Sequence, residues 1–102
     1  MSLKKRYLKS KPVCKVTFEL PRKAAPGATS VGLAGDFNGW DPRATPLARK
    51  KSGDFNVTLE LAPGREYQFR YVIDGQTWEN DWQADGYAPS TIPGVENSVV
   101  AV

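Results

Sequence analysis

Apolar and polar residues alternate along three segments of this chain with a period of two residues, and no other feature constrains the fold as much. A strand with one buried face has that period, whereas an amphipathic helix has a period of about 3.6 residues. The alternating segments are residues 13–20, 55–62 and 67–73. No segment sustains the helical period, so we expect little or no helix.

Turn-forming residues separate these segments at short intervals. Eight Pro and nine Gly are spread along the 102 residues instead of being concentrated in one tract. Asp74-Gly75 favours a type I′ hairpin turn, in which both central residues need positive φ. Shorter apolar runs at 30–34, 76–79 and 97–102 bring the expected strands to six. We therefore predict an all-β, immunoglobulin-like β-sandwich of six to eight mostly antiparallel strands.

The residue types that the sequence lacks narrow its chemistry. There is no His, which removes Ser-His-Asp and Cys-His nucleophile systems and His-based zinc sites. Glu79, Asp81 and Asp85 lie close in sequence, but their spacing matches neither a calcium loop nor the carboxylate pair of a glycosidase. A single cysteine, Cys14, forms no internal disulfide, and no long apolar run is present. We expect a cytoplasmic protein with no catalytic residue, metal, cofactor or membrane contact.

Basic residues are concentrated at the N-terminal end of the chain. Six of the fourteen lie within the first fifteen positions, where there is no acidic residue. Residues 16–102 hold eight basic and eleven acidic residues, a net of −3, which argues against nucleic acid as a partner. We expect residues 1–12 to be a basic, flexible arm and residues 13–102 to be the folded domain, in a monomer.

Two tryptophans beside turns are candidates for a binding surface. Trp40 lies between Asn38-Gly39 and Asp41-Pro42, and a tryptophan between two rigid turns is favoured for display, although it can also fold back over the end of the sandwich. Trp78 follows the Asp74-Gly75 hairpin. If it points outward, it forms with Trp40 a flat apolar platform that suits a sugar ring or a nucleic-acid base.

Three further residues are placed to contribute to such a platform. Arg70 has the opposite parity to the inward-facing residues of its strand, so its guanidinium points outward to sugar hydroxyls, a carboxylate or solvent. Asn97 offers a donor and an acceptor, as sugar recognition requires, but is also an ordinary residue to find before a strand. Trp82 is a weaker candidate for stacking, because tryptophans commonly anchor long loops.

Three motifs occur in the order, and near the spacing, of a known family. They are Gly35-Asp36-Phe37-Asn38-Gly39-Trp40, then Tyr71-Val72-Ile73-Asp74-Gly75 followed by Trp78, and Glu96-Asn97-Ser98-Val99-Val100. Together they resemble the isoamylase early-set domains, the N-terminal β-sandwich modules of glycogen branching and debranching enzymes. Relatives of these include the glycogen-binding domain of the AMP-activated protein kinase β subunit. The resemblance, from about Val13 to Val102, implies that Trp40 and Trp78 stack on glucose rings and that Arg70 and Asn97 bond sugar hydroxyls.

The chain departs from the family pattern at three positions. Thr77 is an extra residue between the hairpin and Trp78, Val95 replaces a sugar-bonding threonine of the kinase subunit, and Trp82 stands where enzyme-linked members often have proline. The resemblance implies a non-catalytic module that binds an α-glucan polysaccharide or malto-oligosaccharide of the glycogen or starch type. The alternative is a protein-interaction or regulatory module on a glycogen-metabolising enzyme without sugar contact. A free-standing branching enzyme ranks below both.

Overall fold

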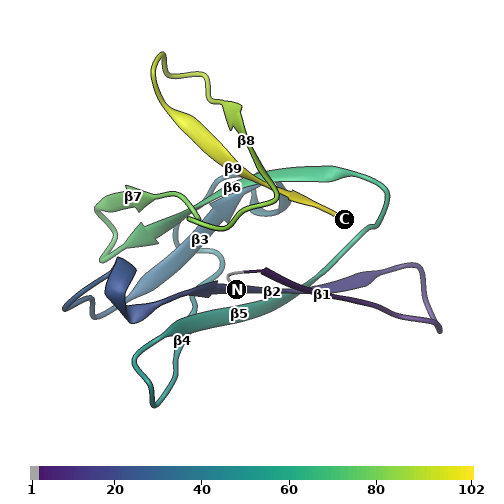
Figure 1. Ribbon diagram of the computed structural model, residues 1–102, viewed down its shortest axis with the longest axis horizontal. Helices are drawn as coiled ribbons and strands as arrows, with labels where there is room; N and C mark the ends of the chain where they lie inside the picture. Colours follow the sequence, from purple (N-terminus) through teal and green to yellow (C-terminus); the bar gives the residue numbers. More distant parts are fainter. Residues whose placement is uncertain (1–2) are drawn as a thin grey trace.

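A computed structural model describes residues 3–102, which form nine β-strands in two antiparallel sheets (Figure 1). Sheet A has the order β1-β2-β5-β4, and sheet B has the order β3-β6-β9-β8 with β7 paired to the other end of β6. The strands are β1 Leu3–Tyr7, β2 Cys14–Leu20, β3 Val31–Gly35, β4 Ala48–Arg49, β5 Phe55–Leu61, β6 Glu66–Ile73, β7 Thr77–Glu79, β8 Gly86–Pro89 and β9 Glu96–Ala101.

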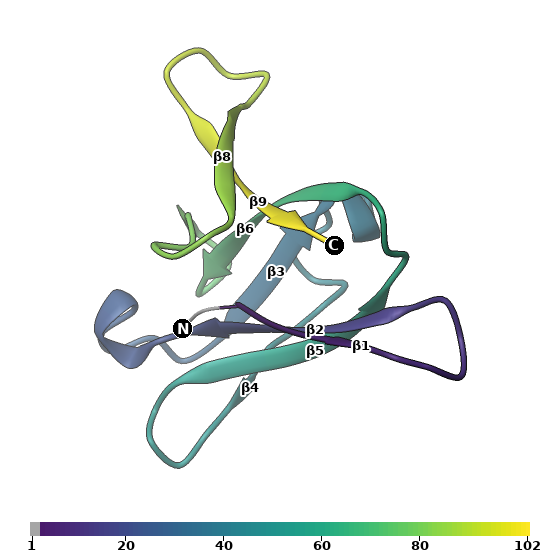
Figure 2. The ribbon, with the colours of Figure 1, turned by 45° about the vertical axis from the view of Figure 1, so that its right-hand side comes forward.

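The predicted all-β sandwich is confirmed. Figure 2 shows the sheets as separate layers, with β3, β6 and β9 above β1, β2 and β5. The helical content of residues 3–102 is two single turns of 3₁₀ helix, η1 Arg22–Ala24 and η2 Asp36–Asn38. The strands beyond the expected six are β1, β4 and β8, which are short or lack a clear alternation.

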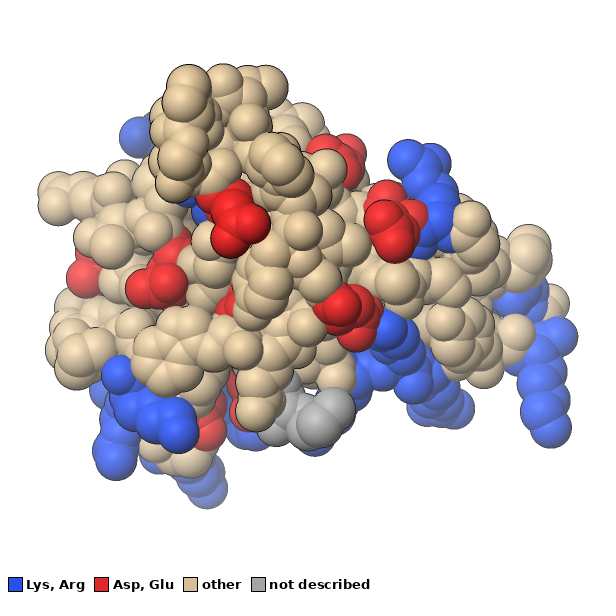
Figure 3. All heavy atoms as spheres, turned by 45° about the horizontal axis from the view of Figure 1, so that its top comes forward, with Lys and Arg blue, Asp and Glu red and all other residues tan. Residues whose placement is uncertain are grey.

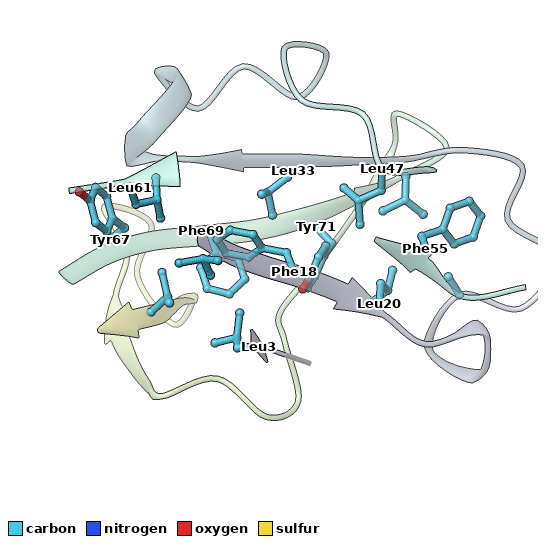
Figure 4. Close-up of a cluster of buried hydrophobic side chains, with 14 of the residues drawn as sticks. Leu3, Phe18, Leu20, Leu33, Leu47, Phe55, Leu61, Tyr67, Phe69 and Tyr71 are labelled. Atoms are coloured by element: carbon cyan, nitrogen blue, oxygen red, sulfur yellow. The ribbon is translucent and has the colours of Figure 1, made fainter. Parts of the chain in front are cut away.

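The core lies between the inner faces of the two sheets, as the period-two pattern requires. Phe18 of β2 meets Phe69 of β6 edge to face, with the ring centroids 5.0 Å apart. Tyr71 packs against Phe69 in the same manner at 5.8 Å. Figure 4 shows these rings with Leu33 from β3, and all four side chains are fully buried. The inward parity predicted for β6 therefore positions its other face toward solvent.

The structure differs from the expected flexible arm at residues 1–12, because residues 3–7 form strand β1 at the edge of sheet A. Leu3 is buried, Lys5 pairs with Asp85 at 2.7 Å, and the Tyr7 hydroxyl donates to the carbonyl of Val102 at 2.7 Å. Charge density alone suggested a solvated arm, whereas backbone pairing with β2 and these anchors order the segment. Residues 1 and 2 lie outside the described part of the chain. No helix among residues 3–102 is long and apolar enough to cross a membrane.

Candidate functional site

The outer face of sheet B carries the predicted site residues. Along β6 the inward set is Tyr67, Phe69 and Tyr71, so Gln68 and Arg70 lie on the outward face, as parity predicted for Arg70. Neighbouring β9 pairs with β6 in a register that sets Phe69 opposite Ser98. In this antiparallel register, the next pair along the two strands is Arg70 of β6 and Asn97 of β9. Residues directly opposite each other on adjacent strands share a face, so these two polar side chains are neighbours.

The hairpin between β6 and β7 determines which way Trp78 points. Asp74 and Gly75 have φ of 52° and 69°, and the Gln76 amide donates to the Ile73 carbonyl at 3.0 Å, as in a type I′ turn. A two-residue turn alone would set Ile73 opposite Gln76, and hence Trp78 opposite the inward Tyr71. In the structure Ile73 lies opposite Thr77, with Gln76 as an extra residue.

The bulge at Gln76 keeps Trp78 on the outward face. Trp78 lies opposite Val72, on the outer face of sheet B, and 40% of its surface is exposed. A shift of one residue exchanges the two faces of a strand. The extra residue between the hairpin and Trp78, counted at Thr77 in the sequence, is accommodated in the structure by leaving Gln76 unpaired, without loss of the outward indole.

Arg70 and Trp78 form one unit on this face. The guanidinium carbon of Arg70 lies 5.0 Å from the centroid of the indole, within the range of a cation–π interaction. The Nε atom of Arg70 is buried and finds no hydrogen-bond partner in the described part of the chain. Arg70 is therefore held in place by the ring while one of its donors remains unused.

The loop that carries Trp40 is rigid because its polar side chains bond back to the sheet. Asn38 accepts from the Gly35 amide and donates to the Leu33 carbonyl. Asp36 accepts from the Trp40 indole Nε1 at 3.0 Å and, through its other oxygen, from the Gln68 amide of β6 at 2.7 Å. The aspartate thus ties the tryptophan to the outer face of sheet B.

The backbone at Trp40 itself is unusual. Its φ is 61°, a left-handed value that is uncommon for a bulky residue and carries strain. The sequence placed the unusual backbone at Asn38-Gly39, and the structure has it at Gly39 and Trp40. Trp40 is half-buried, so it is neither fully displayed nor folded into the core.

Asn97 is 7% exposed and its two side-chain atoms are unequal in their contacts. The Nδ2 group donates to Gln68 Oε1 at 3.0 Å, which fixes the orientation of the amide. The Oδ1 acceptor is buried, and no group within residues 3–102 donates to it. A buried polar atom without a partner is rare in folded proteins and needs an explanation.

These side chains line an open pocket of about 460 Å³, which we call the first pocket. Trp40, Arg70 and Asn97 line it together with Asp36, Gln68 and residues 89–92. Pro89 ends β8, and residues 90–92 belong to the connection between β8 and β9, which extends beyond the body of the sandwich (Figures 1 and 2). Three of the four predicted residues thus meet in one pocket, and the fourth, Trp78, adjoins it through Arg70.

Sequence reasoning missed part of the pocket. Gln68 shares the outward parity of Arg70, so the strand pattern could have identified it as a pocket residue. It was not predicted, because an outward glutamine is common on any strand. Asp36 was named within the Trp40 motif without its tethering role. Ile92, which is 56% exposed, lies in a loop without strand pattern, and nothing in the sequence placed it beside Trp40.

The acidic cluster and Trp82 lie apart from the first pocket. Asp81 is buried and accepts a hydrogen bond from the Tyr71 hydroxyl at 2.9 Å, while its amide donates to Ser98. Burial, with the nearby Asp81 charge, raises the pKa of Tyr71 well above 10.0, so the phenol stays protonated. Asp81 therefore anchors this loop to the body of the sandwich. Trp82, which is 56% exposed, does not. Within residues 3–102 no group of acidic or cysteine side chains is arranged to hold a metal.

Charge is distributed unevenly over the molecule. In Figure 3 acidic side chains are spread over the middle of the visible face, and Lys and Arg gather along its lower edge and right-hand side. On sheet A, Lys4 lies opposite Thr17 and Arg6 opposite Lys15. The first pocket combines one carboxylate, Asp36, with one guanidinium, Arg70. A pocket with balanced charge suits a neutral polar ligand better than an ion.

A family model described as the glycogen recognition site of AMP-activated protein kinase matches residues 14–91. Similar curated proteins include 1,4-alpha-glucan branching enzymes. The enzyme of Butyrivibrio fibrisolvens is 36% identical over 66 residues, which cover 63% of this chain and 10% of the enzyme. That of Xanthomonas campestris pv. campestris (strain 8004) is 35% identical over 80 residues, which cover 76% of this chain and 11% of the enzyme. That of Myxococcus xanthus (strain DK1622) is 38% identical over 79 residues, which cover 74% of this chain and 11% of the enzyme. The chain spans about a tenth of the length of these relatives.

Proposed function

The chain belongs to the family of the glycogen recognition site of AMP-activated protein kinase, and we propose that it binds α-glucan at the first pocket, with Trp40, Arg70, Trp78 and Asn97 as the contacting residues. Membership in this family makes the chain a non-catalytic glycogen-binding module. The branching activity named for the longer relatives belongs to proteins of which this chain matches about a tenth.

The two unpartnered atoms of the first pocket carry the proposal. Arg70 Nε is a donor and Asn97 Oδ1 is an acceptor, and the register of β6 and β9 makes their side chains neighbours. A sugar hydroxyl both donates and accepts, so it matches the unmet hydrogen-bonding capacity of both side chains. Both atoms are buried in the free protein, so the two side chains must turn toward the ligand for these bonds to form. Buried polar atoms left unpaired destabilise a fold by roughly 1–3 kcal/mol each, and sugar binding would remove that penalty.

The two indoles supply the apolar part of the interaction. Trp78 keeps 40% of its surface exposed even with Arg70 over its ring, so part of the indole remains available to a glucose ring. Burial of on the order of 100 Å² on both indoles contributes about 2–3 kcal/mol before the cost of association. A single site therefore binds weakly, with a Kd of roughly tens of micromolar to millimolar. Many sites along one polymer raise the apparent affinity.

The departure at Val95 removes a polar contact and leaves the loop intact. Val95 is half-buried, its amide donates to the Ile92 carbonyl, and its carbonyl accepts from the Ser90 amide. Its side chain offers no hydroxyl to a sugar. The hydrogen bonds to a bound glucan are therefore assigned to Arg70 and Asn97.

Titration with maltoheptaose tests this function, with two tryptophan variants as a matched pair. We expect the indole and amide NMR signals of Trp40, Trp78 and Asn97 to shift, and Trp40→Ala to weaken binding by about tenfold or more. Trp82→Ala removes a more exposed tryptophan outside the first pocket and should leave the affinity unchanged.

Absence of shifts at Trp40 and Asn97 at millimolar sugar, with the protein folded, would contradict glucan binding at this site. In that case a protein co-purifying from native extract and released by Trp40→Ala would favour the interaction module instead.

A further inference from the structure

A second pocket of about 310 Å³ lies on the same face of sheet B. Its lining includes Val72 of β6, Gly32 of β3, Asp74 of the hairpin, and Pro42 and Arg43 of the Trp40 loop. None of the four predicted site residues lines it, and the proposed function leaves it unexplained.

The two pockets follow one another along β6. Arg70 lines the first and Val72 lines the second, and the two residues point to the same face because they are two apart on one strand. Trp78 lines neither pocket, but it lies opposite Val72 and stacks with Arg70, one residue of each pocket. The loop that carries Trp40 continues directly into Pro42 and Arg43. A chain that leaves the first pocket along β6 therefore meets the second.

A close approach of the backbone forms one wall of the second pocket. The Pro42 carbonyl occupies the space that a Cβ on Gly32 would fill, so only glycine allows the loop to cross β3 here. Residues 45–47 then follow β3, where Leu33 N donates to the Thr45 carbonyl and Leu47 N to the Val31 carbonyl. The wall is thus fixed by backbone hydrogen bonds and is present without a ligand.

The groups in the second pocket fit a polyhydroxylated ligand. Asp74 accepts three hydrogen bonds through Oδ1 alone, from the Ser30 and Thr29 amides and the Thr29 hydroxyl. These bonds lower the pKa of Asp74 below 3.8, and Oδ2 receives no hydrogen bond within residues 3–102. Arg43 is exposed, and its guanidinium contributes donors at the other side. Pro42 and the exposed Pro46 supply apolar surface in a pocket that also holds one cation and one anion, a combination that suits a neutral sugar.

We propose that the second pocket is a further subsite for the glucan chain that occupies the first, so that the module contacts a longer stretch of the polymer than its two tryptophans cover. The inference rests on the proposed function and extends it to chain length. Short oligosaccharides fill the first pocket alone, and longer ones also reach Arg43 and Asp74.

Comparison of maltotriose with maltoheptaose tests the subsite. Maltotriose should shift the amides of Trp40, Gln68 and Asn97, and maltoheptaose should in addition shift those of Gly32 and Gly75. Arg43→Ala should weaken maltoheptaose by about three- to tenfold and change maltotriose by less than about twofold, since one charged hydrogen-bonding group is lost. Arg49→Ala, which removes an exposed guanidinium on sheet A, is the control and should change neither affinity.

The outcomes separate the subsite from the proposed function. If both sugars shift the first pocket, but Arg43→Ala leaves maltoheptaose unchanged or weakens both sugars equally, the subsite is overturned and glucan binding stands. If neither sugar shifts Trp40 or Asn97, glucan binding fails, and the subsite fails with it.

Discussion

The two outer faces of the sandwich are built from similar strands but differ in whether their polar groups are satisfied. On sheet A, Thr17 lies opposite Thr58 and their hydroxyls bond at 2.8 Å. On sheet B, Arg70 and Asn97 share a face and each keeps a buried atom without a partner among residues 3–102. The pair on sheet A is satisfied in the free protein, whereas the two atoms on sheet B are the ones that we propose to bond a ligand.

Loops at the borders of sheet B produce this difference. The Trp40 loop is tied to β6 by Asp36, and residues 89–92 form the facing wall. Together they shield Arg70 and Asn97 from solvent, whereas the corresponding face of sheet A carries exposed Lys4, Arg6 and Thr58. The strand register places polar side chains next to one another, and the loops on either side enclose them in a pocket.

Insertion of an alanine between Thr77 and Trp78 should give the largest effect, because it should remove the outward indole from sheet B. With Thr77 still opposite Ile73, the inserted alanine lies opposite Val72 and Trp78 lies opposite Tyr71, whose side of the sheet is already filled by the core. Either the indole turns inward or β7 separates from β6, and in both cases Arg70 loses its ring. We expect maltoheptaose binding to fall by about tenfold or more, as for loss of a stacking aromatic, and the Tm to fall.

Gln76→Ala is the control for this insertion, since it keeps the chain length and the register. It should bind maltoheptaose like the wild type. If the insertion variant also binds normally, the orientation of Trp78 does not matter and the contrast between the two faces loses its strongest support.

Acidification should destabilise a turn in each sheet, because in both turns a carboxylate accepts hydrogen bonds from backbone amides. Asp74 accepts from the Ser30 and Thr29 amides, and Asp54, at the turn before β5, accepts from the Arg22 amide at 2.7 Å. These bonds favour the charged carboxylates and lower both pKa values below 3.8. A lowered pKa in the folded state means that the stabilisation is fully present above pH 3.8. It is lost as the pH falls through the folded-state pKa.

Carboxyl NMR titration of the folded protein measures this effect directly. We expect Asp74 and Asp54 to titrate below 3.8. Asp74→Asn keeps an acceptor and tolerates the left-handed backbone, so it should remove the acid sensitivity of the β6–β7 hairpin and leave that of Asp54. An Asp74 that titrates at or above 3.8 would show that the hairpin is not held by its carboxylate.

The sequence predicted most of the sandwich and the outward face of Arg70, but not the way in which the candidate site residues come together. Period-two alternation identified the long strands and the outward parity of Arg70, because burial of one face imposes that pattern. The edge strand β1 was missed because three of its five residues are basic, and its ordering depends on pairing with β2. The sequence shows an extra residue at Thr77, and only the register shows that a bulge at Gln76 keeps Trp78 on the outward face.

The first pocket also could not be predicted from the sequence. Trp40 and residues 89–92 are about fifty positions apart, and no local pattern brings their loops to one face. The shared hydrogen bonds of Asp36, one to an indole and one to a backbone amide of β6, depend on the folded arrangement. The residue types predicted which side chains can stack or form hydrogen bonds. Only the tertiary structure shows which of them lie together in the first pocket.

The smallest effect should come from changing the outer face of sheet A. Lys50 Nζ lies 3.4 Å from Glu19 Oε1, and both side chains are partly exposed. Exposed ion pairs contribute about 0.2–1 kcal/mol, so Lys50→Ala should lower the Tm by no more than about 3–5 °C and leave maltoheptaose affinity unchanged. Thermal unfolding and the same sugar titration measure both quantities. A clear loss of maltoheptaose affinity in Lys50→Ala would mean that glucan also contacts sheet A, because this ion pair lies outside the first pocket. The proposal that only the outer face of sheet B binds glucan would then be wrong.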